Sequence, residues 1–141
     1  MKHFKIFFVT IITFTIFTNK SNADEIFELY KYLHSNPELS WQEFKTSDIL
    51  ASKMEDLGFD VTEGFAKTGV VSVLKNGEGP VLMIRADMDA LPIQEKSGLK
   101  YSSKHKGVMH ACGHDAHMAI LLGVAKILSN YKKNLNGTVR F

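Results

Sequence analysis

The hydrophobic spacing along this chain changes from helical to strand-like and back to helical, and this order limits the folds available to it. Apolar residues recur at helical intervals in 24–33 and again from about 40 to 57. Three strand-like segments follow: 59–62, 69–74 and 80–86. A helical pattern returns at 115–131, and a last strand begins at 138. Helices and strands in this order predict an α/β domain.

Local signals add detail to this prediction. Ser40 and Glu43 match a capping box, which places the start of the second helix there. Gly58 suits the left-handed position that ends it. The segment 80–86 (PVLMIRA) is almost continuously apolar, which predicts a strand buried on both faces. The last helix has an apolar stripe that is expected to face the core: Ile120, Leu121, Val124, Ile127 and Leu128.

The first 23 residues have the three zones of a signal peptide, in the required order. A short basic start, 1–5, precedes an apolar run of 12 residues, 6–17, and the zone ends in the small residues of Ser21-Asn22-Ala23. A membrane-spanning helix needs about 20 apolar residues. We therefore predict a signal peptide at 1–23, a domain at 24–141, export to the periplasm or the medium, and no stable membrane anchoring. An uncleaved anchor or an amphipathic helix is the alternative.

The net charge of the chain comes largely from this predicted signal. Without Lys2, Lys5 and Lys20, the 17 basic residues become 14 against 15 acidic ones, so the formal charge changes from +2 to −1. A domain with this balance has no basic footprint for a nucleic acid. No nucleic-acid partner is expected.

The densest polar cluster lies at 109–117 (MHACGHDAH), which holds three histidines, an aspartate and the single cysteine of the chain. Cysteine and histidine are ligands that zinc and similar ions prefer. In a loop before a helix, Gly113 can let Cys112 and His114 converge on one ion. Three alternatives remain open: His114 and His117 as a pair on one helix face, Cys112 as a small buried apolar residue, and each histidine as a surface or capping residue.

A second cluster, 85–92 (RADMDALP), places Asp87 and Asp89 just after the third strand. In open α/β sheets, ligands bind beyond the carboxyl ends of the strands. Asp87 is therefore a candidate to orient a metal-bound histidine. The alternative is that both aspartates only end a strand and solvate a turn.

Together, these clusters resemble the M20 metallopeptidase superfamily, and in particular its amidohydrolase branch of hippurate, N-acyl-amino-acid and plant auxin-conjugate hydrolases. The matching segments are 34–40 (HSNPELS), 85–92 and 109–117, and their order and spacing match as well. The resemblance implies the N-terminal part of a metallohydrolase catalytic domain, with a mixed sheet flanked by helices.

The resemblance also implies a site and a reaction. Cys112 and His114 match metal ligands of a two-metal site, and Asp87 matches the catalytic aspartate that supports it. The implied cofactors are divalent ions of zinc, manganese, cobalt or nickel. The implied reaction is hydrolysis of N-acyl amino acids or similar small amides by metal-activated water, with a glutamate as general base. Full-length relatives are expected to form homodimers.

The sequence departs from the family pattern in its extent. It stops before the Glu-Glu pair that supplies the general base, and the later histidine ligands and the lid or dimerisation domain are absent. It resembles a truncated first third of a family chain. We therefore expect the 141 residues alone to be nearly inactive. The alternative function is that of a truncated, non-catalytic metal-binding remnant.

Overall fold

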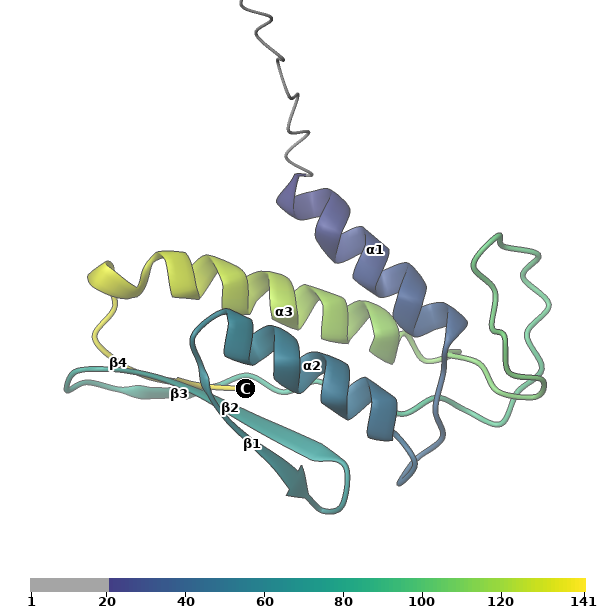
Figure 1. The fold of residues 1–141 in the computed structure, drawn as a ribbon, viewed down its shortest axis with the longest axis horizontal. Coiled ribbons are helices and arrows are strands. Elements are labelled where there is room, and N and C mark those ends of the chain that lie inside the picture. Colours follow the sequence, from purple (N-terminus) through teal and green to yellow (C-terminus); the bar gives the residue numbers. More distant parts are fainter. Residues whose placement is uncertain (1–20) are drawn as a thin grey trace, which may run out of the picture.

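A computed structural model describes residues 21–141, and Figure 1 shows an α/β fold with helices over a small sheet. Residues 1–20, with most of the predicted signal peptide, lie outside the described part. The elements in chain order are α1 (Asn22–Ser35), α2 (Phe44–Asp56), β1 (Asp60–Phe65), β2 (Gly69–Asn76), β3 (Val81–Met83), α3 (His114–Asn130), the short 3₁₀ helix η1 (Lys132–Asn134) and β4 (Gly137–Arg140).

The four strands form one mixed sheet, as the family resemblance implied. Their order is β1-β2-β4-β3. The β1–β2 and β2–β4 pairs are antiparallel, whereas β3 and β4 run parallel. The three α-helices lie on one side of this sheet in Figure 1. The segment 84–113 carries the chain from the edge strand β3 to the start of α3.

The start of α1 has a capping box, and its N-cap, Ser21, lies within the predicted signal peptide. The Ser21 hydroxyl accepts the backbone N–H of Asp24 at 3.2 Å, and the Asp24 carboxylate accepts the Ser21 N–H at 3.2 Å. Cleavage after Ala23 would remove this cap. Among residues 21–141, no helix is long and apolar enough to cross a membrane.

The capping box predicted for α2 is wrong. The helix begins after Ser40, and its N-cap Glu43 makes no side-chain capping bond. The buried Glu43 carboxylate instead accepts the Thr68 hydroxyl at 2.7 Å, which joins α2 to the β1–β2 turn. A residue before the helix caps the first turn of α2: the Glu38 carboxylate accepts the N–H of Thr46 at 2.8 Å. Capping chemistry is present, but it comes from eight residues away. Gly58 adopts the predicted left-handed backbone, with φ of 80°.

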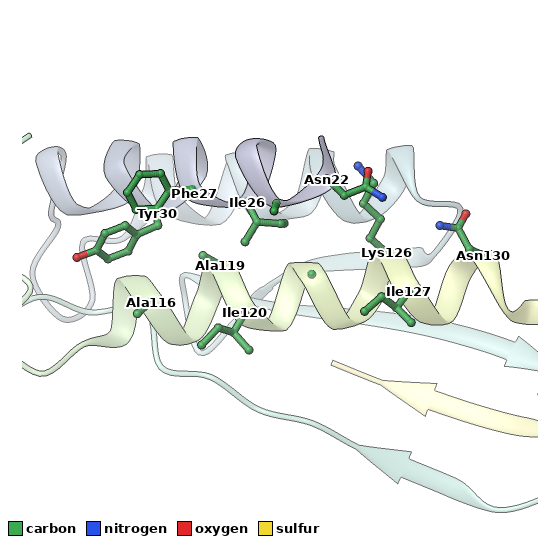
Figure 2. A pocket seen from close by; sticks show the side chains of 12 residues that line it. Asn22, Ile26, Phe27, Tyr30, Ala116, Ala119, Ile120, Lys126, Ile127 and Asn130 are labelled. Atoms are coloured by element: carbon green, nitrogen blue, oxygen red, sulfur yellow. The ribbon is translucent and has the colours of Figure 1, made fainter. Parts of the chain in front are cut away.

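Helices α1 and α3 pack side by side along an apolar groove, to which Ile26 of α1 and Ile120 and Ile127 of α3 contribute (Figure 2). A Cβ added to Gly123 of α3 would lie 3.7 Å from the Ile26 side chain, which is an ordinary van der Waals contact.

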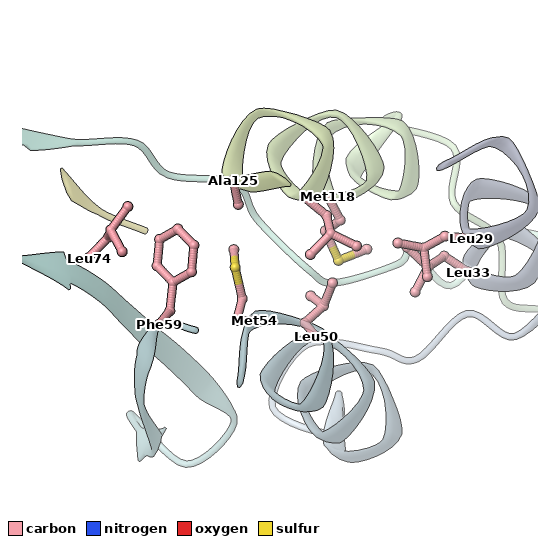
Figure 3. Packing of buried hydrophobic residues seen from close by; sticks show 9 residues of the cluster. Leu29, Leu33, Leu50, Met54, Phe59, Leu74, Met118 and Ala125 are labelled. Carbon is pink, nitrogen blue, oxygen red and sulfur yellow. The ribbon is translucent and has the colours of Figure 1, made fainter. Parts of the chain in front are cut away.

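The hydrophobic core lies between the helices and the sheet (Figure 3). Its buried residues come from every α-helix and from the sheet region: Leu29, Leu33, Leu50, Met54, Phe59, Leu74, Met118, Leu122 and Ala125. The predicted stripe of α3 is wrong for two of its five residues, because Ile120 and Ile127 stay 61% and 59% exposed, whereas Leu121 packs against the core. This helix is apolar on more than one side, and hydropathy alone does not select the side that packs.

The prediction that 80–86 is buried on both faces is also wrong. Only three of these residues form β3, and Val81, Leu82 and Met83 are 61%, 56% and 73% exposed. The physical reason is topological. The strand lies at the edge of the sheet and pairs only with β4, and no other described element covers it.

Candidate metal centre

The predicted ligands Cys112 and His114 flank Gly113 at the start of α3. Gly113 is the N-cap of this helix, and its backbone is left-handed with φ of 85°. This conformation favours glycine and turns the chain sharply between the two neighbours. Cys112 is exposed and unpaired, which contradicts the alternative of a buried apolar cysteine. An accessible thiol beside an imidazole is a donor pair that suits zinc and similar ions.

His114 is held by Asp89 in the manner of a metal-binding histidine. Its Nδ1 lies 2.9 Å from the carbonyl oxygen of Asp89 and 3.1 Å from the carboxylate Oδ1 of the same residue. Both oxygens are acceptors, so Nδ1 is the nitrogen that donates here, and in the neutral ring the lone pair of Nε2 remains for an ion. Histidine ligands usually donate their other ring N–H to such an oxygen, which fixes the tautomer and the ring. Cys112 and His114 therefore suit a divalent ion as two of its ligands.

Asp87 lies in the same segment but makes a different contact. Its carboxylate pairs with the guanidinium of Arg85, where Nη1 lies 3.3 Å from Oδ2 and a second, closer contact joins Nη2 and Oδ1. We expected Asp87 to accept a hydrogen bond from a metal-binding histidine. In the structure, Asp89 accepts this bond from His114. Residues two apart in an extended segment point to the same side, so the sequence could not separate these carboxylates. The catalytic role of Asp87 stays a prediction.

The described residues supply only part of a closed metal site. Within 21–141, no three His, Cys, Asp or Glu side chains gather closely enough to hold an ion. Catalytic zinc sites normally use three protein ligands and a water. Cys112 and His114 are therefore a candidate pair of ligands that needs at least one more donor.

His110, a buried histidine for which the sequence predicts no role, precedes this pair in the chain. Neither of its ring nitrogens has a hydrogen-bond partner among the described residues. Burial lowers its pKa, and the nearby His34 and His114 lower it further, whereas the charge of Asp115 opposes the shift. The ring is therefore neutral at pH 7. Its membership in the histidine cluster was the only signal in the sequence.

A buried charged cluster is formed by His34, Glu95 and Asp115, and Asp115 is the second residue of α3. The His34 Nδ1 is 2.6 Å from Asp115 Oδ2, and its Nε2 is 3.2 Å from Glu95 Oε1. The three side chains are at most 7% exposed. A neutral imidazole donates from one nitrogen only, so two carboxylate contacts require the imidazolium. His34 and Asp115 lie in two of the segments that carry the family resemblance, but no sequence pattern joined them to each other or to Glu95.

The pKa values of the cluster shift as this pairing requires. Burial alone would lower the pKa of His34, but the hydrogen bonds to Asp115 and Glu95 outweigh burial and raise it. Burial alone would raise the pKa of Glu95. Hydrogen bonds from the Ser97 hydroxyl, the Ser103 N–H and His34 outweigh that effect and lower it to about 2.

These shifts predict how stability depends on pH. The Glu95 contribution is fully present above its ordinary pKa of 4.5 and is lost as the pH falls towards 2. The His34 contribution is fully present below its ordinary pKa of 6.5 and is lost as the pH rises through the higher folded-state value. The cluster should therefore stabilise most between about pH 4.5 and 6.5.

The measurement is urea unfolding at several pH values, for the unmodified chain and for His34→Gln. The difference in unfolding free energy between the two should be largest near pH 5.5 and should shrink above pH 7. A difference that grows from pH 5.5 to pH 9 would contradict the assigned protonation of His34.

Comparison with known proteins was consistent with this geometry. The model of peptidase family M20/M25/M40 matches residues 83–141, the part that contains Asp87, Asp89, Cys112 and His114. An N-acetyl-L-cysteine deacetylase of Bacillus subtilis is 44% identical over 117 residues, which cover 82% of this chain and 28% of the relative. Thermostable carboxypeptidase 2 of Saccharolobus solfataricus is 45% identical over 123 residues, covering 86% of this chain and 31% of the relative.

A solved structure shows the same fold. The YXEP protein of Bacillus subtilis, described as a dinuclear metal-binding peptidase of the M20 family, superposes with a TM-score of 0.78 at 42% identity. The match covers 83% of this chain and 33% of that structure. The chain thus spans about a third or less of the proteins that it matches.

Proposed function

Because the chain belongs to the M20 peptidase family, we propose that it forms the ligand-bearing N-terminal part of a metal-dependent hydrolase that cleaves the amide bond of N-acyl amino acids. A deacetylase of N-acetyl-L-cysteine and a carboxypeptidase among the relatives support a substrate with an amino acid in amide linkage. The dinuclear metal-binding neighbour supports a divalent metal as cofactor.

The observation that carries this proposal is the contact between His114 and Asp89. It keeps the proton on Nδ1 and leaves the lone pair of Nε2 for an ion, while the left-handed Gly113 turns the chain between His114 and the exposed Cys112. A divalent ion bound there would lower the pKa of water and polarise an amide carbonyl. Asp87 is the proposed catalytic carboxylate of this chain, and Arg85 orients it.

Two further parts of the proposal concern the whole protein. The order of zones in 1–23 supports export to the periplasm or the medium, with a mature N-terminus at Asp24. The partner that we expect is a small amide substrate.

A second candidate function follows from the absence of a third ligand beside Cys112 and His114 within residues 21–141. Since no three donor side chains gather within the described residues, the 141-residue chain by itself is proposed to bind an ion weakly and to hydrolyse no amide. The two candidates share one metal site and differ in turnover.

The first experiment tests metal binding by titration with Co²⁺, whose thiolate complexes absorb in the near ultraviolet. The unmodified chain should develop this band. Cys112→Ala should abolish it, and His114→Ala should weaken binding at least about tenfold, because each removes a donor. The matched control is His105→Ala, which removes an exposed histidine of the preceding loop. Equal titrations for all four chains would refute the proposed site.

The second experiment tests turnover in a complete protein. Residues 24–141 would replace the matching third of the Bacillus subtilis YXEP protein, which has the same fold over that region. The chimera, supplied with Mn²⁺, Co²⁺ or Zn²⁺, should hydrolyse N-acetyl amino acids, and Cys112→Ala should abolish this activity. A chimera that folds and binds metal without turnover would contradict the hydrolase proposal. Robust hydrolysis by the 141-residue chain alone would instead refute the second candidate.

A further inference from the structure

The segment 109–115, which carries both candidate ligands, is held at its two ends by different contacts. At its start, Met109 and Leu91 exchange backbone hydrogen bonds of 2.9 and 3.0 Å, which close the loop 91–109 at its base. At its end, the Asp115 carboxylate contacts His34. Between these two points the chain makes the left-handed turn at Gly113. The geometry of the ligands therefore depends on what fixes Met109 and Asp115.

The end of α1 is the element that reaches both sides of the ligand segment. His34 contacts Asp115 across 81 residues of sequence and Glu95 across 61. The next residues continue this role. The Ser35 carbonyl accepts the N–H of Lys104 at 2.9 Å, and the Glu38 carbonyl accepts the N–H of Ala90 at 2.7 Å, directly after the Asp89 that holds His114. Four contacts, from α3, from the loop 91–109 and from Ala90, thus converge on 34–38.

Further contacts hold the side chains of Glu95 and His34 in place. The Glu95 carboxylate accepts the Ser97 hydroxyl and the Ser103 N–H in addition to His34. The rings of Tyr30 and Tyr101 pack against the imidazole, with centroids 5.7 and 5.5 Å away. Because both nitrogens of His34 are engaged by carboxylates, this histidine has no lone pair to offer to a metal ion.

We propose that His34 is a positioning residue for the metal centre, which fixes the Cys112–His114 turn by clamping Asp115 of α3 to Glu95 of the loop 91–109. This inference rests on the proposed function for its metal-dependent part, because it assigns Cys112 and His114 as ligands. The statement that His34 fixes the turn rests only on the contacts of His34 with Asp115 and Glu95. His34 acts through Asp115 and the loop, and it does not touch the ion or the substrate.

The test combines hydrogen exchange with Co²⁺ titration on the purified chain. The variant His34→Gln retains a polar side chain but can no longer donate a charged hydrogen bond to each carboxylate. We expect the amides of Ala111 and His117, which donate to Met109 and Gly113, to exchange at least about tenfold faster. The Co²⁺ dissociation constant should rise about 10–100-fold with a changed thiolate band, as for losses of groups that orient ligands.

The matched control is Met54→Ala, which opens the core in α2 and leaves the clamp intact. It should lower global stability without a selective effect on Ala111, His117 or the Co²⁺ band. Glu95→Gln serves as a second clamp variant if His34→Gln does not fold, and it should shift the same readouts in the same direction.

The outcomes separate the two proposals. If the unmodified chain binds no Co²⁺, the metal site fails, and hydrogen exchange alone still decides whether His34 positions the turn. If the chain binds Co²⁺ and the clamp variants behave like Met54→Ala in both readouts, the positioning role is overturned while the metal site stands.

Discussion

Replacing His34 with leucine is expected to lower the free energy of unfolding by about 3–5 kcal/mol near pH 6. The substitution keeps much of the volume but leaves the Glu95 and Asp115 carboxylates buried without their shared cation. Removing one partner of a buried charged group costs more than the pair contributes, because the remaining charges stay desolvated. Urea unfolding at constant pH measures the loss.

Two controls test whether the loss of stability comes from the buried cluster. His105→Leu changes an exposed histidine and should alter stability by less than about 0.5 kcal/mol. The pair His34→Gln and Glu95→Gln should be non-additive, since both substitutions break the same contact. A loss below about 1 kcal/mol for His34→Leu would mean that the two carboxylates rehydrate, and that the cluster does not hold the loop in place.

Replacing Gly137 with alanine is expected to disrupt the junction of β3 and β4. Gly137 has φ of 105°, a backbone conformation that costs other residues about 1–3 kcal/mol. In addition, a Cβ at this position would lie 2.3 Å from the carbonyl oxygen of Pro80, which is backbone and cannot rotate away. The same oxygen accepts the N–H of Thr138 at 2.9 Å, so a shift that relieves the clash would break the first contact of the parallel pair.

Gly77→Ala is the matched control for this effect. Gly77 also has a positive φ, 77°, but an added Cβ meets nothing within 4 Å. The control should therefore show the cost of the backbone conformation without the clash. Urea unfolding should rank Gly137→Ala as the less stable variant, and the amides of Ile84 and Thr138 should lose exchange protection only there. Equal losses for the two variants would show that Pro80 moves aside at no cost.

The elements of this fold were predictable because their signals are local. The apolar spacing of α1, α2 and α3 and the left-handed Gly58 each depend on neighbours within a few turns of chain. The capping of α2 was not predictable in this way. Its donors are satisfied by Glu38, and the apparent capping residue Glu43 is used by Thr68 instead. A capping box is one of several local solutions, and packing between elements selects among them.

The choice of faces also needed the structure. On α3, the small and medium residues Met118 and Ala125 are buried, while Ile120 and Ile127 remain exposed. The sequence shows how apolar each side is, but the partner that covers a side is set by topology. The same reason explains β3, whose apolar residues lie at an edge that no described element covers.

The candidate site also has features that the sequence predicts and features that only the structure shows. By itself, the sequence determined the order of helices and strands, the donor types at Cys112 and His114, and the glycine between them, because these are properties of adjacent residues. Only the tertiary structure decided that Asp89 holds His114 and that His34 joins Glu95 to Asp115. Contacts between residues 61 and 81 positions apart form only after the chain has folded, and no local pattern of polarity encodes them.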